Sequence, residues 1–432
     1  MMGGERDGMR WLPILMLCLV SLPFRGARAA DDSVRRVNLA EALELLETQN
    51  PDTLAARLQV AEAEAEKVAA RLYTNPALSV DVGNIAVGRT TPPNLGVGQT
   101  IGTTARIDQL FVLWGKRHLR IEGADMGVAA AKEQQRDALR LLRSAVKDAF
   151  YRCVHDQRQL SFAEENQQRY QQVVALNERR FHAGDISEAE FRKIALEQLK
   201  YIAETEDARR SLAESQQLLG RLLGAEEGVA AAGDLGAPSV TVKGDEVLRV
   251  AMDNRPDWAA LQRGRDQAEL ALQLARRERY PDVTLGADYT HSEFVVSGDN
   301  RNTIGFGFSV PLPLLNQNQG EIAKAEVALR QAETELARLR LDLAQEVRTA
   351  LAAYESAQRL RQTFESGYLD DAKITRDAAE ASYRAGAASL IELLDAERTY
   401  TATQTDYLDA LFALRSSVAA LEKAVGKDLT DN

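Results

Sequence analysis

Cysteine is almost missing from this chain, which has two cysteines in 432 residues. Cys18 lies in an apolar stretch at the extreme N-terminus, so Cys153 has no disulfide partner elsewhere in the chain. Leu17 stands before Cys18, where a lipoprotein signal needs a small residue, and we expect no lipid anchor there. The fold is therefore expected to hold together without disulfide bonds.

Histidine is equally sparse, and the four histidines lie in different segments, at His118, His155, His182 and His291. Cys153 and His155 are two residues apart, and residues with that spacing do not face one another on a helix. Transition-metal sites need three or four converging nitrogen or sulfur ligands, so we expect no metal site. The sequence also lacks a Gly-x-Ser-x-Gly elbow, a phosphate-binding Gly-Lys loop and a His-Glu-x-x-His motif, so it predicts neither an enzyme nor a cofactor.

An excess of basic residues is missing too, because the net charge is −11 at pH 7. Nucleic-acid binding needs a basic face against the phosphates, so no nucleic-acid partner is expected. The one long apolar run, at 11–22, follows Arg6 and Arg10 and precedes the small-residue triplet at 27–29. This pattern is typical of a secretory signal peptide at 1–29, and the rest of the chain is too evenly charged for a multispanning helical transporter.

Proline is missing from residues 94–237 and again from residue 314 to the C-terminus. Because proline breaks helix interiors, these two tracts, rich in Ala, Leu, Glu, Gln and Arg, predict long helices. In the second tract, apolar residues alternate three and four apart, the pattern of coiled-coil packing. A helix over 319–383 would be roughly 100 Å long, which is too long for a compact globule. Gly184 and Gly386 predict turns, so helical hairpins are expected at 117–224 and 319–426.

Internal similarity divides the chain after the signal peptide into two copies of one unit. An Asn-Pro-Asp sequence at 50–52 matches Arg-Pro-Asp at 255–257, 205 residues later. The turn at 181–184 matches the turn at 383–386, 202 residues later. The expected domains are a first repeat at 30–227, a Gly/Ala-rich linker at 228–243, and a second repeat at 244–432.

Each copy also has a segment whose pattern has a period of two residues. In the second copy, Ile304, Phe306 and Phe308 alternate with glycine and serine, so large residues occupy one face and small ones the other. This pattern predicts two strands in each copy, at 77–88, 104–114, 282–296 and 302–313.

Strands of this length with apolar and small faces suit an outer-membrane barrel, and the alternative is a small soluble sheet beside a coiled coil. Four strands cannot close a barrel, and open edges are not tolerated in lipid. Oligomerisation would have to complete the barrel. A dimer would supply eight strands and a trimer twelve, and periodicity does not choose between them.

The duplicated unit and two motifs resemble the TolC family of outer-membrane efflux proteins. The first motif is the hairpin turn Tyr383-Arg384-Ala385-Gly386-Ala387-Ala388-Ser389-Leu390-Ile391-Glu392-Leu393-Leu394-Asp395-Ala396. The second is the strand-to-helix junction Val310-Pro311-Leu312-Pro313-Leu314-Leu315-Asn316-Gln317-Asn318-Gln319-Gly320, with Leu113-Trp114-Gly115-Lys116-Arg117 at the equivalent place in copy one. This junction, marked by Pro311, Pro313 and Gly115, resembles the branch that serves cobalt, zinc and cadmium resistance pumps. The similarity covers nearly all of residues 38–426.

The resemblance implies a mainly α fold with a small transmembrane β part. Three chains would form a homotrimer, with a 12-stranded β-barrel in the outer membrane of a Gram-negative bacterium and a 12-helix α-barrel across the periplasm. It implies a passive exit duct of a tripartite efflux system, with a periplasmic adaptor and an inner-membrane resistance-nodulation-division pump as partners. The branch implies heavy-metal cations as cargo, with multidrug export as the alternative. A periplasmic adaptor and a soluble coiled-coil scaffold are the other interpretations of the hairpins.

The same resemblance implies a gate, because the family closes its tunnel at the periplasmic tips with acidic residues around the constriction. By position, the acidic ring corresponds to Glu392 and Asp395. The hydrogen-bonding tyrosine corresponds to Tyr383, and the partner site of the gate in copy one corresponds to Glu190. From spacing alone, Glu392 and Asp395 share one helix face, which is also what a solvated surface would show.

One position departs from the family pattern. Ala388 occupies the place where some members have a gate arginine, so the salt link of that arginine is not available here. Closure is therefore expected to use other contacts, with Arg384 and Arg192 as candidates.

Overall fold

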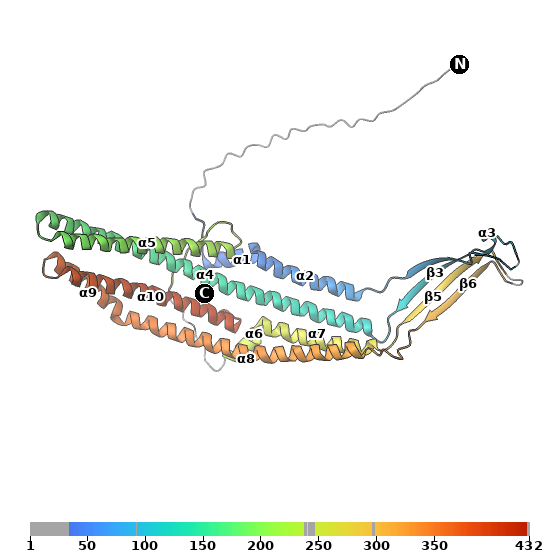
Figure 1. Ribbon diagram of the computed structural model, residues 1–432. Helices are drawn as coiled ribbons and strands as arrows, with labels where there is room; N and C mark the ends of the chain where they lie inside the picture. Colours follow the sequence, from blue (N-terminus) through green and yellow to red (C-terminus); the bar gives the residue numbers. More distant parts are fainter. Residues whose placement is uncertain (1–33, 92, 237–239, 241–246, 296–298, 430–432) are drawn as a thin grey trace, which may run out of the picture.

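The computed structural model describes residues 34–91, 93–236, 240, 247–295 and 299–429. The signal peptide expected at 1–29 lies outside these residues, as does part of the expected linker at 228–243. The described chain is elongated, with two helical hairpins side by side and a β-sheet at one end (Figure 1). The hairpin turns lie at the end opposite the sheet.

The first hairpin consists of α4 (Lys116–Ala183), a single helix of 68 residues, and α5 (Glu188–Leu222). The second consists of α8 (Gln319–Thr363), η1 (Phe364–Tyr368), α9 (Leu369–Arg384) and α10 (Leu390–Val425). The two hairpins pack against one another through α4 and α10. Both tracts without proline are therefore helical hairpins, with turns at the two predicted glycines.

The prediction of one continuous helix over 319–383 is wrong. A π-helical turn, η1, separates α8 from α9, and inside it Gly367 has a φ of 133°, outside the helical region. Glycine tolerates such a φ because it has no Cβ, and Ser-Gly pairs are a common cause of kinks. The apolar three-and-four spacing in the sequence is regular only as far as Ala357, before the kink, so it could not reveal the break.

Each copy also contains two shorter helices, which precede its hairpin in the chain. In copy one these are α1 (Leu39–Gln49) and α2 (Pro51–Arg71), and in copy two α6 (Val247–Asn254) and α7 (Pro256–Glu278). Proline stands at the first position of α2 and of α7, where its missing N–H is not needed. Helix α2 packs along α4, and α7 lies between α4 and α8.

The four-stranded antiparallel sheet has the order β2-β3-β5-β6. Its strands are β2 (Ala77–Gly83), β3 (Gly102–Phe111), β5 (Val283–Ser292) and β6 (Asn302–Ser309), and the short helix α3 (Val97–Thr100) precedes β3. The strands are shorter than expected at their C-terminal ends. Asn84 directly follows β2 and has a positive φ, which ends extended pairing, and Pro311 lacks the N–H that a longer β6 would need.

The expected linker also contributes to the core, which the sequence did not indicate. Ala230–Ala231 form β4, which pairs in parallel with β1 (Arg36–Val37). Buried residues of α1, α4 and α5 surround this pair, including Leu46, Phe150 and Leu219. The chain between the copies is thus anchored at the middle of the bundle.

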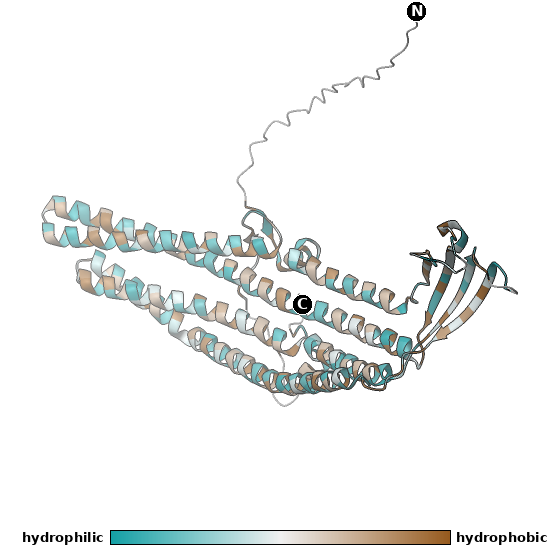
Figure 2. Cartoon of the chain, turned by 45° about the vertical axis from the view of Figure 1, so that its right-hand side comes forward, coloured by the Kyte–Doolittle hydropathy of each residue, from teal (hydrophilic) through white to brown (hydrophobic). Residues whose placement is uncertain are grey.

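Hydrophilic and hydrophobic residues are interspersed along the whole length of the helices, and the strands carry bands of both kinds (Figure 2). Three buried apolar clusters lie along the bundle, and one of them joins the tips of the two hairpins. Among the described residues, no helix combines the length and apolar character needed to cross a membrane.

Candidate gate and channel wall

Each hairpin turn is made by a glycine in the left-handed conformation followed by a capping serine. Gly184 has a φ of 83° and Gly386 a φ of 78°, a region that favours residues without a Cβ. Ser187 accepts a hydrogen bond from the Glu190 backbone N–H at 3.2 Å, which caps α5. The predicted tip residue Glu190 therefore lies in the first turn of α5, where a carboxylate is favoured by the helix dipole.

Glu392 has a structural task at the other tip. Its carboxylate accepts the Ser389 backbone N–H at 2.7 Å, while Ser389 accepts the Glu392 N–H at 3.3 Å, so the two residues form a capping box. Asp395 lies one turn further along α10, and both carboxylates are exposed in the single chain. The exposed pair therefore lies at the hairpin tip.

Tyr383 ties the two hairpins together. Its hydroxyl donates to Asn177 Oδ1 at 2.5 Å, and both residues are buried. The Asn177 amide in turn donates to the Val173 carbonyl at 2.8 Å, which fixes its orientation. Tyr383 thus bonds to Asn177 on α4, a contact that the resemblance did not indicate. The signal that the sequence did offer was an asparagine one turn from Val173 in an apolar stripe.

The two arginines considered as substitutes for the gate arginine pair within their own helices. Arg384 lies 2.5 Å from Glu380 and Arg192 lies 2.5 Å from Glu188, each four residues earlier. Ala388 is half-buried and packs against the apolar cluster that joins the tips. In this conformation of the chain, the Tyr383–Asn177 bond and apolar packing connect the hairpins at this point.

A buried carboxylate lies about two turns into α10 from the tip. Glu397 is 8% exposed, and its burial raises its pKa, while Arg169 and Arg376 act in the opposite direction. Arg376 lies over the Tyr400 ring at 4.0 Å, and its Nη1 is buried without a hydrogen-bond partner. Sequence reasoning missed this group, because a single glutamate among many on a helix gives no sign of burial.

The junction between sheet and helices depends on a pair of left-handed residues. Trp114 and Gly115 have φ of 61° and 74°, and the Trp114 indole N–H donates to the Pro281 carbonyl at 2.9 Å. Lys116 is 4% exposed, and its ammonium lies 2.7 Å from the Tyr280 carbonyl and 2.9 Å from Asp282 Oδ1. These contacts fix the start of α4 against the start of β5.

The junction of copy two is built differently. Pro311 is exposed and Pro313 half-buried, and both lie in the segment between β6 and α8. Asn318 has a φ of 64° just before α8, and its amide donates to the Ala275 carbonyl at 2.8 Å. The predicted junction residues therefore lie where the chain changes from strand to helix in both copies.

The sheet has one strongly apolar face. In the paired register, Leu78 and Val80 of β2 lie on the same side as Phe306 and Phe308 of β6. Phe306 is 85% exposed, and all of these side chains are open to the surroundings of the single chain. A large exposed apolar face marks a contact with lipid or protein.

Comparison of the whole chain with known protein families supports the same two-copy architecture. A family profile described as outer membrane efflux protein matches residues 42–225 and 247–427, which are the two copies. The chain belongs to this family. It is therefore a channel of the TolC type, a transport protein and not an enzyme.

Relatives of this efflux protein include proteins named for metal cations. It is 25% identical over 394 residues to the cobalt-zinc-cadmium resistance protein CzcC of Cupriavidus metallidurans, which covers 90% of each chain. It is 26% identical over 426 residues to the cation efflux system protein CusC of Escherichia coli, which covers 92% of this chain and 87% of CusC.

Solved structures of the family have the same fold. A CusC structure matches with a TM-score of 0.75 and 22% identity, covering 90% of this chain and 92% of the other. The open state of the MtrE outer membrane channel of Neisseria gonorrhoeae matches with a TM-score of 0.73 and 18% identity, covering 91% and 90%. The mainly helical fold with its small antiparallel sheet is thus the family fold.

Two further clusters of charge on this efflux protein are satisfied internally. His155 lies 2.8 Å from both Asp156 and Asp409, one at each ring nitrogen. In the part of the chain that the structure describes, no three or more His, Cys, Asp or Glu side chains form a group suited to a metal ion.

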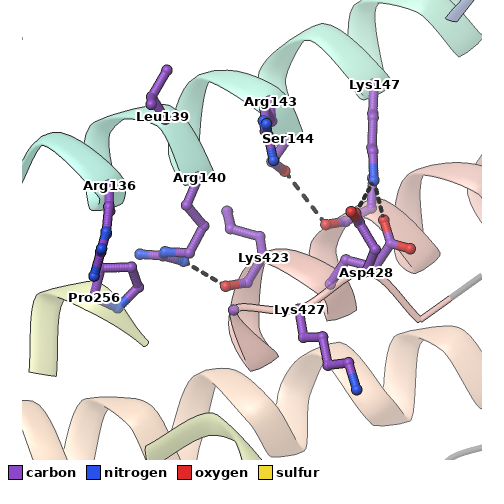
Figure 3. Close-up of a pocket in the computed structure, with 13 residues that line it drawn as sticks. Arg136, Leu139, Arg140, Arg143, Ser144, Lys147, Pro256, Lys423, Lys427 and Asp428 are labelled. Atoms are coloured by element: carbon purple, nitrogen blue, oxygen red, sulfur yellow. Dashed lines mark hydrogen bonds and ion pairs between the residues drawn. The ribbon is translucent and has the colours of Figure 1, made fainter. Parts of the chain in front are cut away.

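The second cluster lines a pocket where α10 ends against α4 (Figure 3). Lys147 reaches Glu422 at 2.7 Å and Asp428 at 2.6 Å, and Arg140 donates to the Lys423 carbonyl at 2.5 Å. Burial lowers the pKa of Lys147, but the two carboxylates outweigh it and the pKa is raised overall. At this pocket, ion pairs and hydrogen bonds connect α4 of copy one to the C-terminal end of copy two.

Proposed function

We propose that this chain is the outer-membrane duct of a tripartite efflux system, and that its cargo is heavy-metal cations. The functional unit is a homotrimer whose three sheets form a 12-stranded barrel and whose hairpins form a tunnel through the periplasm. A periplasmic adaptor and an inner-membrane resistance-nodulation-division pump are its partners, and the pump supplies the energy. The duct is built from two repeats, at 30–227 and 244–432, and is exported by the signal peptide at 1–29.

The observation that carries this proposal is the sheet. Its apolar face is exposed, and β2 and β6 are its edge strands, so a single chain leaves backbone groups of both edges available for pairing. A lipid bilayer tolerates only closed barrels or helices, because unpaired backbone groups are costly there. Identical neighbours that join β6 to β2 would remove both edges at once.

Support for the cargo comes from the relatives. CzcC and CusC are named for cobalt, zinc, cadmium and cation efflux, and each is similar along nearly the whole chain. The exposed carboxylates of Glu392 and Asp395 at the tip suit a passage that cations must enter. In a trimer, six such carboxylates would lie around the opening, which attracts cations and repels anions.

The trimeric duct can be tested by cross-linking. Cysteines placed on β2 at 78–82 and on β6 at 302–308 of one chain, in the Cys153→Ser background, should form disulfides between neighbouring subunits. Membrane extracts would then show a ladder that ends at three chains, whereas pairs on β2 and β5 should give none. A water-soluble single chain without affinity for the bilayer would refute the duct.

The cargo can be tested in a deletion strain. Loss of the protein should increase sensitivity to zinc, cobalt and cadmium, and the intact chain should restore resistance. Sensitivity only to organic drugs would refute metal cargo and leave the duct intact.

The gate can be tested without disturbing the fold. Glu392→Gln keeps a side chain that can complete the capping box but removes the charge, and Asp395→Asn does the same one turn later. The doubly neutral variant should show a weaker cation preference in planar-bilayer conductance. An unchanged preference would remove the gate role of these carboxylates.

A further inference from the structure

The face of the sheet opposite the apolar one carries charged residues near its centre. Arg106 and Asp108 lie in the middle of β3, and Arg106 pairs in register with Asp288 of β5. Side chains alternate between the faces of a strand, so these three lie on the face away from Phe306 and Phe308. Two neighbouring rows of this face thus hold one arginine and two aspartates.

The three charges contact one another directly. Arg106 Nε lies 2.9 Å from both carboxylate oxygens of Asp108, and Arg106 Nη1 lies 3.9 Å from Asp288 Oδ1. The side chains are between a quarter and about a third exposed in the single chain, with 36% for Arg106, 28% for Asp108 and 24% for Asp288. Arg106 therefore neutralises Asp108 more fully than it neutralises Asp288.

Glycines in the neighbouring strands make room for these side chains. A Cβ at Gly286 would lie 2.4 Å from Asp108 Oδ1 and 2.5 Å from Arg106 Nη2, both closer than real Cβ atoms come. A Cβ at Gly305 would lie 2.7 Å from Asp288 Oδ2. The charged side chains thus occupy space above the neighbouring strands that is free only because Gly286 and Gly305 have no side chain.

We propose that Arg106, Asp108 and Asp288 are specificity-determining residues of the duct, forming a charged ring on the inner wall of the barrel that tunes its selectivity between cations and anions. This inference rests on the proposed trimeric duct, because only a closed barrel turns the polar face toward an enclosed, water-filled lumen. The Arg106, Asp108 and Asp288 side chains of three copies place nine charges in this ring, six negative and three positive.

The arginine is the adjustable member of the ring. With Arg106 in place, each subunit contributes a net charge of −1 from the cluster, and without it −2. The ring lies in the sheet, at the end of the molecule opposite Glu392 and Asp395. It would therefore act on an ion at the membrane after that ion has passed the periplasmic tips.

Arg106→Gln removes the positive charge and leaves both aspartates. For an ion about 10 Å from three such charges in salt solution, screened attraction predicts a rise of about twofold to fivefold in the cation-to-anion permeability ratio. Asp288→Asn should lower the ratio by a similar factor, and Arg106→Lys, which keeps the charge, should leave it near the original value. The ratio is measured from reversal potentials of purified trimers in planar bilayers under a salt gradient.

Two glycines supply a matched pair of variants that change no charge. Gly286→Ala must displace Arg106 and Asp108, whereas the Cβ of Gly307→Ala would lie 3.7 Å from Arg106 Nη2, an ordinary contact. Gly286→Ala should therefore alter the permeability ratio and Gly307→Ala should not. If the two variants have the same permeability ratio, the space at Gly286 does not determine the positions of Arg106 and Asp108.

The outcomes separate this inference from the proposed function. Wild-type protein that forms no trimer and no conducting channel would refute the duct itself. A conducting wild-type trimer whose permeability ratio is the same after Arg106→Gln and after Asp288→Asn would refute the ring and leave the duct standing. Retention of the trimer by each variant on a gel confirms that a changed ratio reflects charge and not misfolding.

Discussion

The hydrogen bond between Tyr383 and Asn177 gives a sharp test of how the hairpin tips hold together. Tyr383→Phe removes only the hydroxyl that donates to Asn177 Oδ1 at 2.5 Å. Asn177 is completely buried, so its carbonyl oxygen would be left without this donor and without access to water. Leaving a buried acceptor unsatisfied costs about 1–3 kcal/mol.

Because the bond joins the two hairpins, this cost should appear as easier local opening of the tip. An energy of about 1–3 kcal/mol corresponds to a rise of about fivefold to 150-fold in the rate of amide exchange through local opening. Hydrogen exchange followed by mass spectrometry on the purified protein would measure it in peptides covering 170–185 and 380–395.

Two variants serve as controls for this prediction. Tyr407→Phe removes a hydroxyl that donates to Glu365 at 3.1 Å on an exposed part of α10, so exchange at the tip should not change. Replacing both partners, with Tyr383→Phe and Asn177→Leu together, should restore much of the protection, because no unsatisfied group remains. Tip peptides that exchange equally fast in the wild type and in Tyr383→Phe would refute the assigned role of the bond.

Three further predictions follow from single sites. Gly367→Ala forces a side chain into a φ of 133° and should lower the stability by about 1–2 kcal/mol in thermal unfolding, whereas Gly264→Ala in regular α7 should be neutral or stabilising. Lys116→Met removes the ammonium that donates to the Tyr280 carbonyl and to Asp282, and should cost about 1–3 kcal/mol, seen as a lower melting temperature that Lys116→Arg partly restores. The raised pKa of Glu397 means that the folded chain holds this proton more tightly than the unfolded chain, so its stabilising effect is complete below pH 4.5 and is lost as the pH rises through the raised pKa. The melting temperature of Glu397→Gln should fall less than that of the wild type between pH 4.5 and neutral pH, and parallel curves would contradict the assignment.

Elements set by local sequence could be predicted well. Proline-free tracts located both hairpins, and Gly184 and Gly386 located their turns, because backbone conformation at those points depends on the residue itself. Alternation located the four strands, since one face of each is apolar. The strand ends were less accurate, because they depend on single residues such as Asn84 that take positive φ.

Contacts between distant segments could not be predicted. The β1–β4 pair depends on two residues in each strand that meet only once the bundle has formed. Lys116 and Asp282, or Tyr383 and Asn177, are separated by more than 160 residues, and nothing in either sequence segment specifies the other. Residue type limits which partners are possible, but tertiary structure chooses among them.

The duplication itself contains the clue to the kink that periodicity missed. At the offset of 202 residues, Gly367 corresponds to Glu165, which lies inside the continuous helix α4. A good helix former in copy one and a glycine in copy two predict different local stability at equivalent positions, since glycine costs about 1 kcal/mol in a helix. The structure has a regular helix in the first case and a π-turn in the second. The two hairpins therefore differ. The long helix of copy one is continuous, whereas that of copy two is interrupted at Gly367.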